Sequence, residues 1–285
     1  MNKAVIVSDS TIDLTKADYE KNNIRIVPLI VRLGEKQFKD GVDISALDIF
    51  NHFKETKELP ATAAVSSEEL YEVFKEEIDK GNDVVFVGIG SNLSSTLQAA
   101  NIAKMELPEK RVFIVDSLNL SSASGILALK GANLARKGNS ASYIANKLNK
   151  MAPKLSAQFG VESLDFLHKG GRCSGTARVI GKLFHVHPIA KIKDQKLMLY
   201  KMPRGKIEAY LDTLIDIVKE DKGNIDEDYV MITCTEDMDK KYIDYVKQGL
   251  KDIVKESCIH VTPVGSVISS HCGPGTLGIL YLKNN

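Results

Sequence analysis

The sequence predicts an α/β protein made of two α/β domains. Strand-like and helix-like segments alternate over almost all of the 285 residues, which is the pattern of sheets covered by helices. Hydrophobic residues make up 44% of the chain and charged residues 26%, values typical of a globular protein with a packed core. This length suits one large domain or two medium ones.

The expected strands and helices follow one another regularly. The first apolar run, Ala4–Ser8, is short and ends at polar residues, so we interpret it as a first strand and not as a signal peptide. Further strands are predicted at Ile24–Val31, Val84–Gly88, Val112–Asp116, Ser156–Val161, Pro188–Ile192, Lys196–Tyr200, Tyr229–Thr233, Ile259–Val264 and Thr276–Leu282. Helices are predicted at Leu47–Lys54, Glu68–Asp79, Ser95–Lys104, Ser122–Arg136, Ala141–Met151, Lys206–Lys219 and Lys240–Lys255.

The best candidate for a domain boundary lies near Pro153, where a long amphipathic helix ends and a new strand begins. This predicts an N-terminal domain over residues 1–153 and a C-terminal domain over residues 154–285. Two α/β halves of similar size leave a cleft between them, which is a favoured position for a small-molecule site.

Charge and composition exclude several classes of function. The net charge of +1 gives no general attraction to nucleic acid or to an anionic membrane. No segment approaches the ~20 apolar residues of a membrane span, so no stable membrane insertion is expected. The four cysteines show neither CxxC spacing nor a paired His/Cys pattern, which argues against a zinc site and against a disulfide framework. Thiols without an export signal predict a cytoplasmic protein.

Two loops in the first third of the chain carry hydroxyl groups. Ser10 and Thr11 follow the first strand, at the end of a strand where α/β proteins bind ligands, although either residue could simply cap the next helix. Further on, Ser66 and Glu69 have the spacing of a capping box. Thr62 lies ahead of that box, in a loop of small residues, and its hydroxyl is free to reach a ligand.

A third loop, residues 88–96, joins a strand to a helix and is rich in glycine and serine. Backbone N–H groups at a helix start attract anions, and Ser94 and Ser95 add hydroxyl donors at the same place. A helix cap explains the loop equally well. It fits neither a GxGxxG nor a Walker A sequence, so nucleotide binding is not indicated.

An arginine and a histidine complete the candidates. Arg172 follows Gly170 and Gly171, in a tight turn ahead of an expected helix, where it can pair with a carboxylate or form a structural salt bridge. His271 lies between two predicted strands near the C-terminus and can hydrogen-bond a carboxylate, although a single histidine is more often structural. Together these residues lack a nucleophile–base–orienter set, a metal cluster and paired carboxylates, so they favour anion binding over hydrolysis.

These motifs resemble those of the DegV family of fatty-acid-binding proteins over essentially the whole chain. The resemblance is carried by the Ser8-Asp9-Ser10 strand end, the Asp40–Ile44 segment, the Thr62 loop, the 91–96 loop, the Gly170-Gly171-Arg172 turn and the closing Ser270-His271-Cys272-Gly273-Pro274-Gly275. It implies two α/β domains with a lipid between them, and no cofactor besides one bound long-chain fatty acid such as palmitate.

The resemblance also implies roles for individual residues. Thr62 and Ser94 match the residues that contact the acyl carboxylate, and His271 matches the histidine near the head group. Ser95 stands where the family usually has glycine, and Ala63-Ala64-Val65 replaces its Ser-Gln-Pro. Members of the family can serve a fatty acid kinase, so the protein is expected to be a non-catalytic carrier that presents the carboxylate to such a partner.

A basic run between Lys182 and Lys206, which includes Lys201 and Arg204, follows Arg172 in the chain. We hypothesise that Arg172 and this run dock the kinase, although a solvated face is the usual explanation of such a run. The alternative function is a phosphotransferase or a hydrolase that acts in the inter-domain cleft. A nucleic-acid-binding role is disfavoured because no recognisable module is present.

Overall fold

The fold begins with a parallel sheet covered by helices on both faces. We analysed a computed structural model, which describes residues 2–174 and 185–285. Its four-stranded sheet has the order β2-β1-β6-β7, and all three pairs are parallel. The strands are β1 (Ala4–Asp9), β2 (Ile24–Val27), β6 (Asp83–Gly88) and β7 (Val112–Asp116). Valines and isoleucines fill them, as expected for strands that are buried on both faces.

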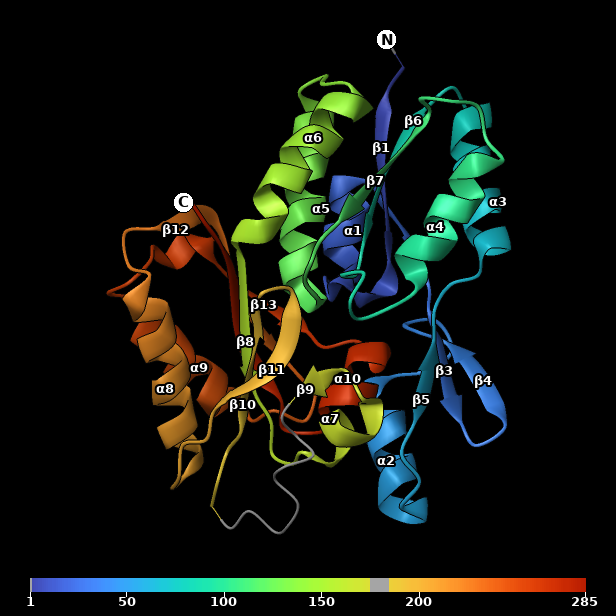
Figure 1. The fold of residues 1–285 in the computed structure, drawn as a ribbon. Coiled ribbons are helices and arrows are strands. Elements are labelled where there is room, and N and C mark those ends of the chain that lie inside the picture. The colour runs from blue at the N-terminus through green and yellow to red at the C-terminus, as the bar shows by residue number, and fades with distance from the viewer. Residues whose placement is uncertain (1, 175–184) are drawn as a thin grey trace.

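Two pairs of helices enclose this sheet. α3 (Ser67–Asp79) and α4 (Thr96–Met105) pack with Phe86 on one face, whereas α5 (Ser121–Arg136) and α6 (Ala141–Met151) pack with Val85 on the other. Figure 1 shows both pairs in the upper part of the molecule. The short elements η1 (Ser10–Ile12), α1 (Lys16–Asn22) and η2 (Ala152–Lys154) lie in the connections.

The second half of the chain forms a mixed, seven-stranded sheet of order β13-β12-β14-β8-β10-β11-β9. Its strands are β8 (Leu155–Gly160), β9 (Cys173–Ser174), β10 (Ile189–Lys193), β11 (Lys196–Lys201), β12 (Ile225–Cys234), β13 (Ile259–Pro263) and β14 (Leu277–Lys283). α8 (Ile207–Glu220) and α9 (Lys240–Leu250) cover one face. The short helices α7 (Asp165–Gly170) and α10 (Ser266–Cys272) lie on the opposite side of the sheet, and η4 (Glu256–Cys258) precedes β13.

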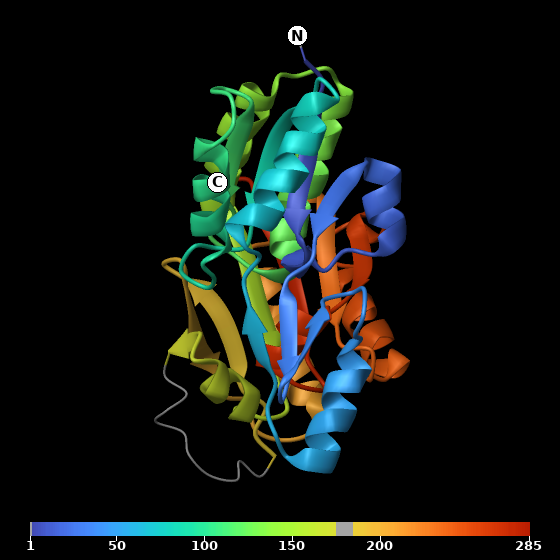
Figure 2. The ribbon, with the colours of Figure 1, turned by 90° about the vertical axis from the view of Figure 1, so that its right-hand side faces the viewer.

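A small sheet connects the two halves. β3 (Ile30–Leu33) pairs with β4 (Lys36–Lys39) and with β5 (Ala61–Ala63), both antiparallel, and α2 (Ala46–Thr56) lies between β4 and β5 in the chain. Figures 1 and 2 show this sheet and α2 extending from the upper layer down to the lower half. There β3, β5 and α2 all contact α10. Residues from the two ends of the chain therefore meet at α10.

α5 packs on both large sheets. Its apolar side chains share one buried cluster with Ile6 of β1 and with Met231 and Leu280 of β12 and β14. The buried hydroxyl of Ser122 in α5 also bonds that of Thr233 in β12. A continuous core of this kind holds the two halves in one orientation, because separating them would expose apolar surface to water.

The predicted α/β class is confirmed, with local corrections. The expected strand Ile24–Val31 is two strands, β2 and β3, because Pro28 lies between them and has no N–H for a sheet ladder. The expected helix Lys240–Lys255 ends at Leu250 as α9. The division at 153/154 stays a prediction. Among the described residues no helix is long and apolar enough to cross a bilayer.

Candidate functional site

A cavity of about 310 Å³ lies where β5, the loop before α4, the end of α7 and α10 meet. It brings together all five predicted site residues, namely Thr62, Ser94, Ser95, Arg172 and His271. The rest of its wall is mostly apolar and consists of Leu29, Ala63, Ala64, Ile89, Leu93, Leu120, Leu167, Leu197, Val267, Ile268 and Cys272. A mostly apolar cavity with a few polar groups at one place is the usual form of a small-molecule site.

Thr62 lies on a strand, which corrects the prediction of a loop. It is the middle residue of β5 and pairs with Val31 of β3. The following Ser66 and Glu69 form the predicted capping box at the start of α3. A strand fixes the direction of a side chain better than a loop does, because the ladder with β3 holds the backbone of β5. The half-buried Thr62 hydroxyl is therefore held in place at the cavity wall.

His271 lies near the end of α10, which corrects the expectation of a loop between two strands. Its Nε2 atom lies 2.9 Å from Oγ1 of Thr62. Its Nδ1 atom is buried and has no hydrogen-bond partner within residues 2–174 and 185–285. One ring nitrogen thus hydrogen-bonds the Thr62 hydroxyl, and the other has no partner among the described residues. An unsatisfied polar atom is unusual for a buried group.

Burial and, to a smaller extent, the positive charge of Arg172 lower the pKa of His271 to about 4. Burial disfavours the charged imidazolium because water no longer solvates it. The ring is therefore neutral at pH 7 in the ligand-free protein. In this state it can donate one hydrogen bond and accept one.

Ser94 and Ser95 have different roles at the start of α4. Ser94 is half-buried, and its Oγ lies 2.9 Å from Oγ1 of Thr96 and accepts a 3.3 Å hydrogen bond from the Thr96 backbone N–H. The exposed Ser95 is the N-cap residue, but its side chain makes no capping bond. The capping interpretation therefore fits Ser94, and both serines still line the cavity.

Arg172 sits at the mouth of the cavity. Gly171 before it has a φ of 67°, a left-handed conformation that favours glycine, as the tight turn predicted. The guanidinium of Arg172 donates hydrogen bonds to two carbonyl oxygens, that of Gly170 at 2.6 Å and that of Leu93 at 3.4 Å. Within the described residues it forms no ion pair, so no salt bridge neutralises its charge. The helix expected after it falls outside the described residues.

The expected caps in the first loop are wrong. Asp9, not Ser10 or Thr11, caps η1, and Thr15 caps α1 through its side chain. Ser10 bonds Asp40. Neither Ser10 nor Thr11 lines the cavity of Thr62 and His271. An Asp is as good a cap as a Ser, so the residue types alone did not separate these choices.

Leu120 and Ile268 are among the cavity-wall residues that the sequence did not single out. Together with Cys272 they also line a smaller apolar pocket of about 10 Å³ next to Phe159 and Gly278. Nothing in the sequence separates such residues from ordinary core positions, because an apolar tunnel wall and an apolar core use the same side chains. Within the part of the chain that the structure describes, no group of three or more His, Cys, Asp or Glu residues is placed to hold a metal ion.

Comparison with known proteins identifies the family. The family model described as "Uncharacterised protein, DegV family COG1307" matches residues 3–284. The chain belongs to the DegV family. A DegV domain-containing protein of Clostridium acetobutylicum is 30% identical over 283 residues, and 99% of each chain is covered. The predicted family is thus confirmed.

Two solved structures are similar in fold to this chain. The first is a DegV family protein from Thermus thermophilus, whose structure is described as showing fatty acid binding. It has a TM-score of 0.88 at 27% identity, with 99% of each chain covered. The second is a stearic acid-binding protein from Eubacterium ventriosum. It has a TM-score of 0.84 at 27% identity, with 100% of this chain and 99% of that chain covered.

Proposed function

We propose that this DegV protein binds one long-chain fatty acid in the cavity of Thr62 and His271. The observation that carries the proposal is the pairing of these two side chains at the wall of an apolar cavity, beside the half-buried hydroxyl of Ser94 and the guanidinium of Arg172. Solved relatives that are 27% identical are described as binding fatty acid or stearic acid. Donors at one place and apolar walls elsewhere match a carboxylate joined to a hydrocarbon tail.

The tail supplies most of the affinity. A C16 acid such as palmitate buries roughly 15 carbons at about 0.8 kcal/mol each, or ~12 kcal/mol before the costs of association. Those costs are about 4–15 kcal/mol. Tight binding therefore needs a preformed channel. The small pocket that shares Leu120, Ile268 and Cys272 with the main cavity adds apolar wall next to it, and we propose that the end of a longer tail lies there.

The head group fixes the orientation of the acid. A buried carboxylate without partners is costly, and the hydroxyls of Thr62 and Ser94 together with the neutral His271 ring provide donors for it. The nearby positive charge of Arg172 favours the ionised acid. We propose that these groups hold the carboxylate at the mouth of the cavity, with the exposed Ser95 at the rim.

We further propose that the protein is a cytoplasmic carrier, divided into domains at 153/154, that presents the acid to a fatty acid kinase. Arg172 is exposed at the cavity wall, and Lys191 and Lys201 lie over the ring of the exposed Tyr200 on the β10–β11 hairpin. Exposed positive side chains of this kind would steer a partner of opposite charge towards the protein.

A hydrolase is the second candidate, because one observation favours it. A hydroxyl at 2.9 Å from an imidazole nitrogen is the geometry of a nucleophile and its general base. A triad also needs a group that orients the base, and among the described residues Nδ1 of His271 has no such partner. The pair therefore fits carboxylate binding better than acyl transfer.

A direct comparison of three ligands tests the proposal. Binding of palmitate, palmitate methyl ester and hexadecane is measured by isothermal titration calorimetry. Palmitate is expected to bind much more tightly than the ester and the alkane, since only the acid offers a carboxylate. Equal binding of all three would mean that Thr62, Ser94 and His271 do not contact the head group. Turnover of the methyl ester or of a nitrophenyl ester that is lost in Thr62→Val would instead favour the hydrolase.

A further inference from the structure

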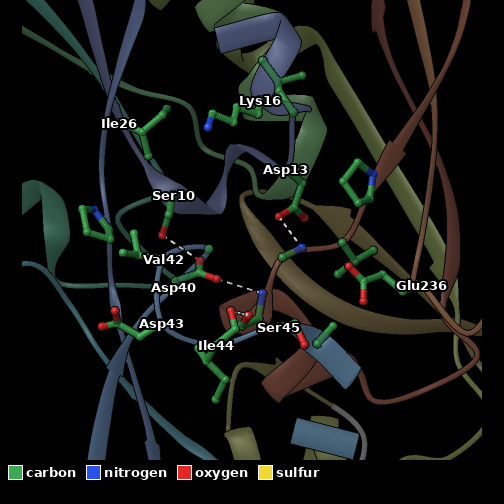
Figure 3. A pocket seen from close by; sticks show the side chains of 18 of the residues that line it. Ser10, Asp13, Lys16, Ile26, Asp40, Val42, Asp43, Ile44, Ser45 and Glu236 are labelled. Carbon is green, nitrogen blue, oxygen red and sulfur yellow. Dashed lines mark hydrogen bonds between the residues drawn. The ribbon is translucent and has the colours of Figure 1, made fainter. Parts of the chain in front are cut away.

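A second cavity of about 750 Å³ shares none of its lining residues with the first. It lies between the Asp40–Ile44 segment, the N-terminal end of α1 and the start of α10 (Figure 3). Two of its acidic residues, Asp13 and Asp40, are almost completely buried, at 3% and 4% exposure. Buried carboxylates are costly unless they are hydrogen-bonded, so their partners reveal what they do.

Asp40 bonds the first turn of α10. Its Oδ1 atom accepts hydrogen bonds from the backbone N–H groups of Ser266 at 2.8 Å and Val267 at 3.3 Å. These N–H groups have no partner inside the helix. The hydroxyl of Ser266 donates to the carbonyl of Ile44, four residues after Asp40. The start of α10 is thus fixed to the Asp40–Ile44 segment, more than 200 positions earlier in the chain.

The other oxygen of Asp40 is connected through Ser10 to the residue before β3, the strand that pairs with the Thr62 strand β5. Oδ2 accepts a 2.7 Å hydrogen bond from the hydroxyl of Ser10, which Figure 3 marks with a dashed line. Ser10 Oγ in turn accepts the backbone N–H of Leu29 at 3.0 Å. Leu29 directly precedes β3, which pairs with β5 at Val31 and Thr62. One carboxylate therefore contacts α10 directly and the base of β3 through a single hydroxyl.

Two neighbouring carboxylates bond the start of α10 and the loop that carries Ser94. Asp13 accepts the backbone N–H of Gly265, just before α10, at 2.9 Å. Asp9 accepts the N–H of Ile89 at 2.8 Å, at the start of the loop that carries Ser94. Burial raises the pKa of all three carboxyl groups. These hydrogen bonds therefore offset only part of the desolvation cost of the three carboxylates. Apolar side chains at the same positions would avoid this cost, so stability alone does not explain the carboxylates.

We propose that Asp40 is a positioning residue of the fatty-acid head-group site, which sets the Thr62–His271 pairing from outside the cavity. His271 lies five residues after Ser266 on a short helix, so any shift of the helix start moves the imidazole as well. Thr62 depends on the register of β3, whose base is fixed through Ser10. The proposal rests on the proposed fatty-acid binding, and it explains why the Ser8–Ser10 and Asp40–Ile44 motifs occur in a chain whose ligand cavity they do not line.

The test compares Asp40→Ala with Asp43→Ala. Asp43 is a matched control, because it lies three residues away, is exposed, and accepts only the Lys39 N–H among the described residues. Two readouts are used, namely the Kd for palmitate and the imidazole NMR resonances of His271 in the ligand-free protein. Those resonances are assigned among the six histidines by their loss in His271→Gln. Circular dichroism and Tm show which variants are folded.

Asp40→Ala is expected to raise the Kd by about tenfold or more, in the range found when groups that orient metal-binding side chains are removed. It should also shift or broaden the His271 resonances, while Asp43→Ala changes neither readout. Ser10→Ala removes one of the bonds to Asp40 and should act in the same direction with a smaller effect. Asp40→Ala thus separates a positioning role from a structural one. If the Asp40 carboxylate were only structural, its removal would lower the Tm and leave the Kd and the His271 resonances unchanged.

A folded Asp40→Ala that keeps both the wild-type Kd and the wild-type His271 resonances overturns the proposal, whatever its Tm. If Asp40→Ala does not fold, the same result with Ser10→Ala overturns it. Failure of the wild-type protein to bind palmitate contradicts the proposed function instead. In that case the His271 resonances alone decide whether Asp40 positions the histidine.

Discussion

Gly170 lies directly against the imidazole of His271, and a methyl group at position 170 would clash with the Nδ1 atom. Gly170 is the last residue of α7, and its backbone does not need a positive φ. A glycine in a helix costs stability relative to alanine, so conformational freedom does not explain this residue. Contact with the histidine ring explains it.

Gly170→Ala is therefore expected to displace His271 and to weaken palmitate binding by about 1–3 kcal/mol, the cost of disturbing a partner of a charged acceptor. The melting temperature should change little, because alanine itself favours the helix. The measurement is titration calorimetry beside thermal unfolding.

A double-mutant cycle separates this clash from other effects. In a His271→Ala background there is no ring to clash with, so Gly170→Ala should cost no further affinity. If Gly170→Ala costs the same in both backgrounds, it acts through the α7 backbone and not through His271.

The head-group hydroxyls should each contribute to affinity. Thr62→Val and Ser94→Ala are expected to weaken fatty acid binding by about 1–3 kcal/mol each, since each leaves the carboxylate short of a donor. Thr213→Val in α8 and Ser142→Ala in α6 are matched controls far from the cavity. Wild-type affinity in the Thr62→Val/Ser94→Ala double mutant would rule out this head-group assignment.

The charge state of His271 should change when an acid binds. In the ligand-free protein its pKa is lowered to about 4, chiefly by burial. A carboxylate beside the ring favours the imidazolium, so the pKa of His271 should rise on palmitate binding. An NMR titration with and without palmitate measures the change. Two coinciding titration curves would mean that the histidine does not contact the head group.

His271 should also make stability depend on pH. Its pKa is near 6.5 in the unfolded chain and about 4 in the folded one, so between these values the unfolded state binds more protons. Stability from this group is complete above pH 6.5 and is lost as pH falls towards 4.

The wild-type protein should therefore lose about 1–2 kcal/mol more stability than His271→Gln between pH 7 and pH 5. Urea unfolding of both ligand-free proteins at the two pH values measures the difference, and the comparison cancels the opposite contribution of the buried Asp9, Asp13 and Asp40. If the unfolding free energies of the two proteins change equally between the two pH values, the His271 ring is solvated in the folded protein and its pKa is not lowered.

Docking of a kinase should depend on the positive charge of Arg172 and of the basic run. Charge reversal at Lys201 and Arg204 is expected to slow acyl-phosphate formation by an added fatty acid kinase, mostly at low salt, and to leave palmitate binding intact. Arg172→Ala should have a larger effect of the same kind.

Charge reversal at Lys137 and Lys150, in and before α6, is the control for net charge. Loss of palmitate binding in Arg172→Ala would mean that Arg172, which lines the cavity, serves to bind the acid and not only to dock the kinase. Unchanged kinase turnover in all variants would reduce the basic run to a solvated face.

The sequence predicted the regular elements well because their signals are local. Buried valine and isoleucine runs identified β1, β6 and β7, and the Ser66–Glu69 capping box marked the start of α3. The short helix α10 was missed, since its N-cap is Gly265 and its cap acceptors, Asp13 and Asp40, come from distant parts of the chain. No local rule reports a cap supplied from the other end of the sequence.

The candidate site shows the same division. Thr62, Ser94, Arg172 and His271 were singled out one by one, and family resemblance grouped them. Their convergence on one cavity is a property of the fold. The buried Asp40 network could not be foreseen, because the residues Ser10, Asp40 and Ser266 look like ordinary caps when each is considered alone.

Native mass spectrometry of the protein purified from bacteria tests the central claim most directly. The fatty-acid carrier is expected to retain one long-chain acid per chain, and Thr62→Val/Ser94→Ala should retain much less. A wild-type protein that carries no such mass, and that takes up no palmitate when it is added, would contradict the account.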